Sequence, residues 1–221
     1  MILSTTFELL GNGLLQTLYM TIVATVFSYL FGLPLGIILN ITSKNGITPN
    51  KWVYGTLNLI VNIFRSIPFL ILLVFVMPFT KILIGTRIGT TASIVPLVIA
   101  AIPFIARMIE SSLSETSKGV IEASEAMGTS KFKIIYKVLL PEAKPSLLVG
   151  FSISIVTILG YSAMAGFVGG GGLGDIAYQY GYVRNDSELM FFTIILLVII
   201  VQVFQEIGMI LAKKFDHRIN K

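Results

Sequence analysis

The feature that most constrains the fold is a stretch near the start of the chain, from Leu9 to Ser43, that contains no charged residue. A helix that crosses the ~30 Å hydrocarbon core of a bilayer needs about 20 mostly apolar residues, and this stretch is longer. The whole chain is 55% hydrophobic and only 12% charged, and soluble domains carry roughly twice that charged fraction. We therefore expect an all-α membrane protein.

Four more segments are apolar and long enough to cross a membrane. The five expected spans are residues 14–41, 57–79, 91–109, 147–168 and 189–211. Gly32, Pro34 and Gly36 lie in the first span; membrane helices tolerate such residues, and small side chains let helices approach closely. No internal repeat or linker interrupts the sequence, so we expect residues 1–221 to form a single transmembrane domain.

Basic residues concentrate in alternate loops. Residues 42–51, 107–146 and 212–221 hold twelve Lys and Arg, whereas residues 1–13, 80–90 and 169–188 hold three. Cytoplasmic loops carry the basic excess in membrane proteins. We therefore expect the N-terminus outside and the C-terminus inside. The net charge of +5 then reflects topology and does not indicate binding to nucleic acid.

The composition leaves little room for catalysis. There is no cysteine and the single histidine, His217, lies in the charged tail, so neither a disulfide nor a thiolate or histidine-cluster metal site is expected. The glycine-rich run from Gly169 to Gly174 lacks the lysine of a phosphate-binding loop. We interpret this run as a tightly packed or flexible turn, or as a hinge of an outer gate.

A charged island, Val120 to Pro141, stands between two apolar spans. It predicts two short amphipathic helices in water. The first ends at Gly128, a residue suited to a left-handed helix stop. The second begins near Thr129 or Ser130, which can cap its first turn, and Pro141 limits its extent. Phe132, Ile135, Tyr136 and Leu139 are expected on one face of this second helix.

Within this island, Glu122-Ala123-Ser124, Gly128 and Val138-x-Leu140-Pro141 resemble the pattern E-A-A-x3-G-x9-I-x-L-P. That pattern marks the cytoplasmic loop of permease subunits of bacterial ABC importers; Ser124 and Val138 are conservative departures from it. The resemblance implies that the loop, about residues 110–146, is a coupling segment that docks on a separate ATPase subunit. The residues expected to make this coupling surface are Glu122, Ala123, Ala126, Met127, Gly128, Phe132, Leu140 and Pro141. The alternative is an amphipathic hairpin that only touches lipid headgroups.

Several residues within the spans are candidates for the transport pathway. Arg65 is costly inside lipid, so it either faces a watery path or lies near the interface and extends its charge to water. Ser66 and Pro68 suggest that the helix around them is irregular and lines a cavity. Met164 is expected either at a constriction of the path or in ordinary helix packing. The remaining candidates are Tyr161, Ser162, Gly169 and Gly172.

The resemblance extends over nearly the whole chain, roughly residues 14–211. Arg65-Ser66-Ile67-Pro68-Phe69, Pro103-Phe104-Ile105-Ala106-Arg107-Met108, Tyr161-Ser162-Ala163-Met164 and Tyr178-Gln179-Tyr180-Gly181-Tyr182 look like the methionine importer permease family. This implies a non-catalytic homodimeric permease in the cytoplasmic membrane. Two ATPase subunits would bind the ATP and Mg, and an extracytoplasmic lipoprotein would deliver the ligand. The alternatives are an importer for another small solute or a transporter driven by an ion gradient, for which Glu206 is the only acidic candidate within a span.

Overall fold

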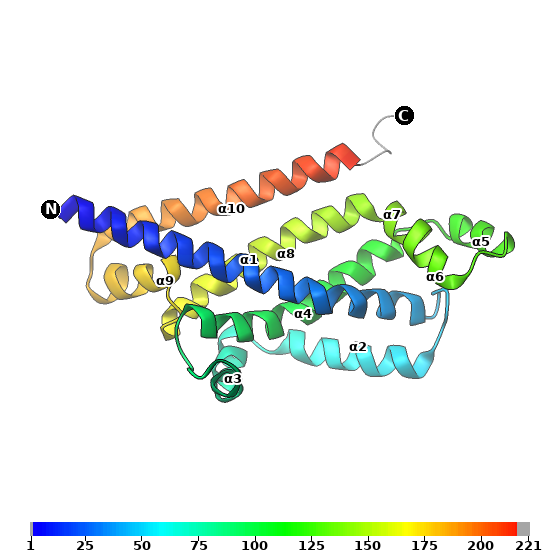
Figure 1. Ribbon diagram of the computed structural model, residues 1–221, viewed down its shortest axis with the longest axis horizontal. Helices are drawn as coiled ribbons and strands as arrows, with labels where there is room; N and C mark the ends of the chain where they lie inside the picture. The colour runs from blue at the N-terminus through cyan, green and yellow to red at the C-terminus, as the bar shows by residue number, and fades with distance from the viewer. Residues whose placement is uncertain (1, 216–221) are drawn as a thin grey trace. The chain divides into compact units, whose positions relative to one another are not determined.

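The computed structural model describes residues 2–215, with side chains from Thr6 onward. Every regular element in this part of the chain is a helix, as predicted (Figure 1). The predicted tail residues His217, Arg218 and Lys221 lie outside the described residues. The helices are α1 (Ile2–Thr42), α2 (Lys51–Ser66), α3 (Phe69–Ile84), α4 (Thr90–Ser114), α5 (Lys118–Ala126), α6 (Lys131–Ile134), the π-helix η1 (Ile135–Leu139), α7 (Leu140–Glu142), α8 (Lys144–Ala165), the short 3-10 helix η2 (Gly166–Val168), α9 (Gly172–Ile176), the π-helix η3 (Ala177–Val183) and α10 (Ser187–Phe215).

Within residues 2–215, four helical segments are long and apolar enough to cross a membrane. They are based on α1, α4, α8 and α10, and they contain four of the five predicted spans. The fifth candidate is the bent pair α2 and α3, which passes the same test only when the two helices are taken together. The protein is thus an all-helical, multi-pass membrane protein with four or five spans.

The predicted second span, residues 57–79, is divided between α2 and α3 at Ile67 and Pro68. Proline has no backbone N–H and disfavours helical geometry at the residue before it. Pro68 has extended backbone angles, φ −57° and ψ 135°, and its carbonyl accepts the amide of Leu72 at 3.0 Å, which starts α3. The irregularity predicted at Ser66 and Pro68 is therefore present, and it is a complete break in the helix.

The chain forms two compact units, each assembled from three separate segments. The first unit comprises Met1–Ser28, Ile67–Ala101 and Ser154–Gln205, and the second comprises Tyr29–Ser66, Ile102–Ile153 and Glu206–Lys221. Long helices such as α1 and α8 contribute one part to each unit.

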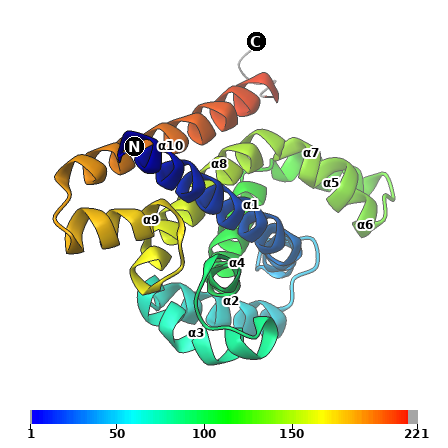
Figure 2. The same ribbon diagram turned by 60° about the vertical axis from the view of Figure 1, so that its left-hand side comes forward.

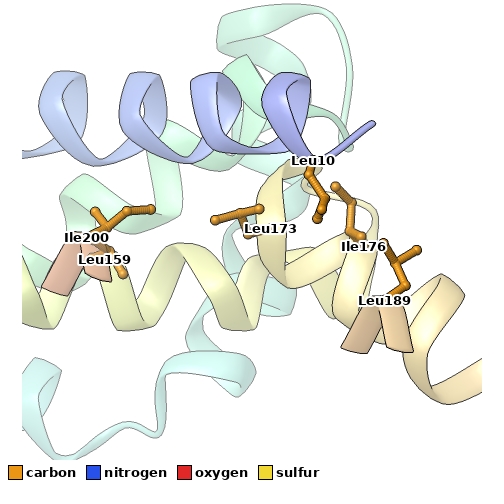
Figure 3. Close-up of a cluster of buried hydrophobic side chains, with 6 residues drawn as sticks. All are labelled: Leu10, Leu159, Leu173, Ile176, Leu189 and Ile200. Atoms are coloured by element: carbon orange, nitrogen blue, oxygen red, sulfur yellow. The ribbon is translucent and has the colours of Figure 1, made fainter. Parts of the chain in front are cut away.

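The first unit has a core of leucine and isoleucine side chains that come from four different helices (Figure 3). Partly buried residues of α1 and α10 pack around this core. Relative to lipid, such side chains gain mainly from close packing, because lipid tails are as apolar as leucine. The core consists of Leu10 of α1, Leu159 of α8, Leu173 and Ile176 of α9, and Leu189 and Ile200 of α10.

In the second unit, α1 lies very close to α4. A Cβ atom added at Gly32 would come within 2.8 Å of Ile105 Cγ2, and one added at Gly36 within 2.6 Å of the Ala106 carbonyl oxygen. Small residues at membrane helix contacts allow this close approach, as predicted for these two glycines. The buried residues Leu39, Val61 and Ala106 then join α1, α2 and α4 in one apolar cluster.

Candidate functional site

The helix α5 ends as its sequence predicts. Gly128 has φ +72°, a left-handed conformation that glycine adopts without a steric penalty. Its N–H donates to the carbonyl of Glu125 at 2.9 Å, and the N–H of Thr129 donates to the carbonyl of Ser124 at 3.2 Å. These two bonds define a Schellman motif, which satisfies the last carbonyls of the helix and reverses the chain. The chain then continues directly into α6, which contacts α5 (Figures 1 and 2).

The hairpin of α5 and α6 buries one side and exposes the other. Ser124 is buried, and its hydroxyl donates to the carbonyl of Val120 at 2.8 Å. Two large apolar side chains are instead strongly exposed: Met127 at 76% and Phe132 at 77%. The other exposed members of the predicted coupling set are Glu122, Ala123, Ala126, Gly128 and Pro141, whereas Leu140 is half-buried. The structure therefore places most of the predicted set on one exposed hairpin.

The second helix of the hairpin differs from the prediction. It begins at Lys131 with Ser130 as the preceding residue, but the Ser130 side chain makes no capping hydrogen bond. Its buried residues are Ile134 and Leu139, while Phe132 and Tyr136 are exposed. The predicted single apolar face is therefore divided. The cause is the π-helix η1, whose wider turns bring residues five positions apart onto the same side.

Pro141 limits the extent of the second helix, as predicted: the helical run that begins at Lys131 ends at Glu142, one residue beyond the proline. Leu139 and Leu140 have right-handed helical angles, so α6, η1 and α7 follow one another without a break, and the N–H of Leu140 donates to the carbonyl of Ile135. The chain then turns at Ala143, whose amide donates to Leu139, and α8 follows at Lys144. The charged segment is thus joined to α8 with almost no intervening loop.

In the first unit, the glycine-rich run is a tightly packed turn. Gly169, Gly171 and Gly172 have positive φ angles. The amide of Gly172 donates to Gln16 Oε1 and that of Leu173 to Thr17 Oγ1, both at 2.8 Å. In a phosphate-binding loop such amides would face an anion, whereas here they are occupied by side chains of α1.

The pathway candidates on α8 have different environments. Tyr161 stacks on Phe69 with ring centroids 4.5 Å apart. Ser162 is buried, and its hydroxyl donates to the carbonyl of Leu159 at 2.7 Å. Met164 is 42% exposed, so of these three it is the side chain with the most room to meet a ligand or a second chain.

The remaining pathway candidates are on the broken span. Arg65 is exposed in the last turn of α2. The Ser66 hydroxyl donates to the carbonyl of Asn62 at 2.8 Å, a back-bond of the kind that often bends helices. Pro68 makes the break described above.

The sequence analysis missed a polar network in the second unit. Arg107 and Glu110 of α4 form a salt bridge at 2.5 Å, with side chains only 25% and 10% exposed. Arg107 also donates to Asn58 Oδ1 at 2.6 Å and to Asn62 Oδ1 at 2.9 Å, both on α2. The spacing of Arg107 and Glu110, three positions apart in a helix, is the sequence signal that would have suggested the pair.

The network extends from Glu110 to two further helices. The Tyr54 hydroxyl of α2 donates to Glu110 Oε1 at 3.2 Å. The Asn40 side-chain amide of α1 donates to the Glu110 carbonyl at 3.4 Å and to Ser114 Oγ at 3.0 Å. Buried polar networks of this kind help to fix the relative placement of the helices that contribute to them, and in this one the groups named above are paired while Arg107 Nε has no hydrogen-bond partner. Glu110 is therefore the residue that links α1, α2 and α4 in this unit.

Asp175 lies in the first turn of α9, outside the candidate spans. Burial raises the pKa of its carboxyl group above the ordinary value of 3.8, because desolvation disfavours the charged form. Deprotonation of Asp175 therefore lowers the stability of the folded state. This loss of stability is absent below the pKa of the unfolded state and develops as the pH rises through the pKa of the folded state.

We expect Asp175→Asn to raise the melting temperature at pH 7, and the gain to disappear as the pH falls below about 3.8. Thermal unfolding of the full-length protein in detergent between pH 3 and pH 8 measures this difference. Glu188→Gln, at an exposed carboxylate in the first turn of α10, is the control and should leave the melting temperature at pH 7 close to that of wild type. A pH-independent result for Asp175→Asn would contradict the assignment.

No group of three or more His, Asp or Glu side chains among the described residues could hold a metal ion. Taken together, the fold and the site define a multi-pass helical membrane protein that carries one polar hairpin with an exposed apolar tip. The family model described as "binding-protein-dependent transport system inner membrane component" matches residues 32–221. The chain belongs to this family.

Two relatives match most of the chain. A Vibrio cholerae protein described as a probable D-methionine transport system permease protein, MetI, is 50% identical over 211 residues, 96% of this chain and 94% of that protein. A Bacillus subtilis protein described as a methionine import system permease protein, MetP, is 43% identical over 209 residues, 95% of this chain and 94% of that protein. A chain in a solved structure of the MetNI methionine ABC transporter, in inward-facing conformations, is 48% identical. It matches with a TM-score of 0.94 over 96% of this chain and 98% of that chain.

Proposed function

We propose that this protein is the permease subunit of an ATP-driven importer of methionine. The observation that carries the proposal is the match, at 43–50% identity over nearly full length, to permeases described as methionine or D-methionine transporters. The structure of one such relative within an ABC transporter supports a partnership with separate ATPase subunits. On this proposal the permease forms the path and the ATPase subunits bind ATP and Mg.

The hairpin of α5 and α6 is, on this proposal, the surface that receives the ATPase. Exposed apolar side chains such as Met127 and Phe132 are suited to an interface core, where large apolar residues contribute most of the binding energy. Glu122, Ala123 and Ala126 provide a small, flat surface beside them. The nearly direct connection of this segment to α8 supports the transfer of a movement of the hairpin to a membrane helix.

We further propose that the hairpin faces the cytoplasm, with the N-terminus outside, in the cytoplasmic membrane. The excess of basic residues in the loops on the hairpin's side supports this orientation. Two copies of the chain, each acting as one transmembrane domain, would enclose the path, and an extracytoplasmic binding lipoprotein would deliver the ligand. Met164 is proposed at a constriction of this path.

The test of the coupling surface is a charge placed at its exposed tip. Met127→Asp should leave the permease folded but reduce both co-purification of the ATPase subunit and methionine-stimulated ATP hydrolysis at least tenfold, because a carboxylate would be desolvated in the interface. Ile88→Asp, the same kind of change at an exposed apolar side chain in the loop between α3 and α4, is the control and should keep co-purification of the ATPase. Normal co-purification of Met127→Asp would refute the docking assignment, and hydrolysis stimulated by another amino acid but not by methionine would refute the ligand.

A further inference from the structure

A cavity of about 390 Å³ lies in the second unit, between the end of α4, the start of α8 and the end of α10. It is distinct from the exposed coupling hairpin, because its walls include neither Met127 nor Phe132. Its volume is within the range of small-molecule sites in proteins. None of the functions proposed above uses it.

The cavity walls carry charges of both signs next to an apolar surface. Glu115 and Glu142 line it together with Lys213, and Val149 and Met209 form part of its apolar wall. Lys144, the basic residue that begins α8, does not line the cavity. Its ammonium group lies 3.3 Å from the centre of the Phe215 ring. The carboxylates suit an ammonium group, the lysine suits an anionic group, and the apolar wall suits a hydrocarbon chain.

Thr116 is a second, independent sign of a ligand. It is 7% exposed and lines the cavity, and its side-chain oxygen has no hydrogen-bond partner. Buried hydroxyl groups are nearly always paired, so an unpaired one beside a cavity indicates a missing partner. Ser146, on the same wall, donates its own hydroxyl to Ser112 at 3.1 Å and remains able to accept a hydrogen bond.

The position of the cavity favours an amphiphile. The last turns of α10 expose Ile207, Ile210 and Leu211, which suit contact with lipid, and Lys213 and Lys214 follow at once. This change from apolar to basic residues is typical of the border between hydrocarbon and water. We propose that the cavity binds a zwitterion with a primary ammonium group and an anionic oxygen group, supplied by the headgroup of an ethanolamine phospholipid. The ammonium lies at Glu115, the phosphate at Lys213 and Thr116, and an acyl chain along Met209.

A second cavity of about 170 Å³ also borders Thr116. Its walls include Asn45 and Lys118 but no carboxylate, so it offers no charged partner to an ammonium group. A substitution of Lys213 distinguishes the two cavities experimentally, because this residue lines only the larger one.

The test measures lipid retention and thermal stability of the full-length permease in detergent with added phosphatidylethanolamine, phosphatidylcholine or phosphatidylglycerol. Wild type should retain phosphatidylethanolamine selectively, because the quaternary ammonium of choline has no N–H to donate. Thr116→Val and Lys213→Gln should each lower this retention about tenfold, the size expected for loss of one hydrogen bond to a charged group. Without added lipid, Thr116→Val should unfold no earlier than wild type, since it removes an unpaired hydroxyl.

The matched control is Thr21→Val, because Thr21 is also buried with an unpaired hydroxyl but is absent from the walls of this cavity. It should retain phosphatidylethanolamine as wild type does. Equal retention of all three lipids by wild type, or full retention by Thr116→Val, would overturn the proposal. Binding of free methionine or O-phosphoethanolamine without any binding of the lipid would overturn the lipid assignment.

Discussion

Replacing Arg107 by alanine is expected to lower the free energy of unfolding by about 3 kcal/mol, near the lower end for breaking a buried ion pair. Its side chain is 25% exposed, which reduces the cost, but its partner Glu110 is only 10% exposed. The variant would leave that carboxylate without its positive partner. It would also remove the donor shared by Asn58 and Asn62 of α2. Unfolding by SDS titration in mixed micelles measures the change.

Arg65→Ala is the matched control, because Arg65 is exposed in the last turn of α2 and its loss should leave stability close to wild type. Arg107→Met combined with Glu110→Met provides a second comparison. Replacing both members of a buried pair by apolar side chains is often neutral, so the double variant should be more stable than Arg107→Ala alone. Equal stability of Arg107→Ala and wild type would mean that the network contributes nothing to the fold.

Gly174→Ala is expected to destabilise the protein by about 2–3 kcal/mol, the upper range for overpacking. A Cβ atom at Gly174 would overlap the backbone carbonyl of Ala163 at the end of α8. Across the same contact, a Cβ atom at Gly166 would overlap the backbone of Gly174 and Asp175. In both cases the overlapped atoms belong to the backbone. No change of side-chain rotamer can therefore relieve the clash, and the turn after α8 must move.

Gly160→Ala is the control for this change, because Gly160 lies in the middle of α8 and a Cβ atom there would meet no atom within 4 Å. It should leave the melting temperature unchanged or slightly raised, since alanine is the better helix former. If Gly160→Ala and Gly174→Ala behaved alike, the difference would not come from close packing. Thermal unfolding of the two variants in the same detergent decides between these outcomes.

Much of the fold was predictable because one physical rule governs it. Lipid requires long apolar helices, so apolar length alone located α1, α4, α8 and α10. The break at Pro68 and the left-handed turn at Gly128 were predictable as well, because proline and glycine restrict or free the backbone locally. These features depend only on residues close together in the sequence.

The features that were missed depend on other kinds of information. The π-helix η1 decides which side of the hairpin is buried, and no residue pattern in that segment distinguishes it from an ordinary α-helix. The bond from Arg107 to Asn58 joins residues 49 positions apart, so it arises only when α2 packs against α4. The tight contact of Gly174 with Ala163 is also tertiary, and glycine content alone did not distinguish it from a hinge.

The turn at Gly128 is held by hydrogen bonds between near neighbours in sequence: Gly128 to Glu125 and Thr129 to Ser124. Its curvature is therefore set within one short peptide and does not depend on how the long helices are packed. A turn held by such local bonds keeps its shape when the helices attached to it move. On the proposed function, the ATPase could therefore bind the same rigid surface at every step of transport.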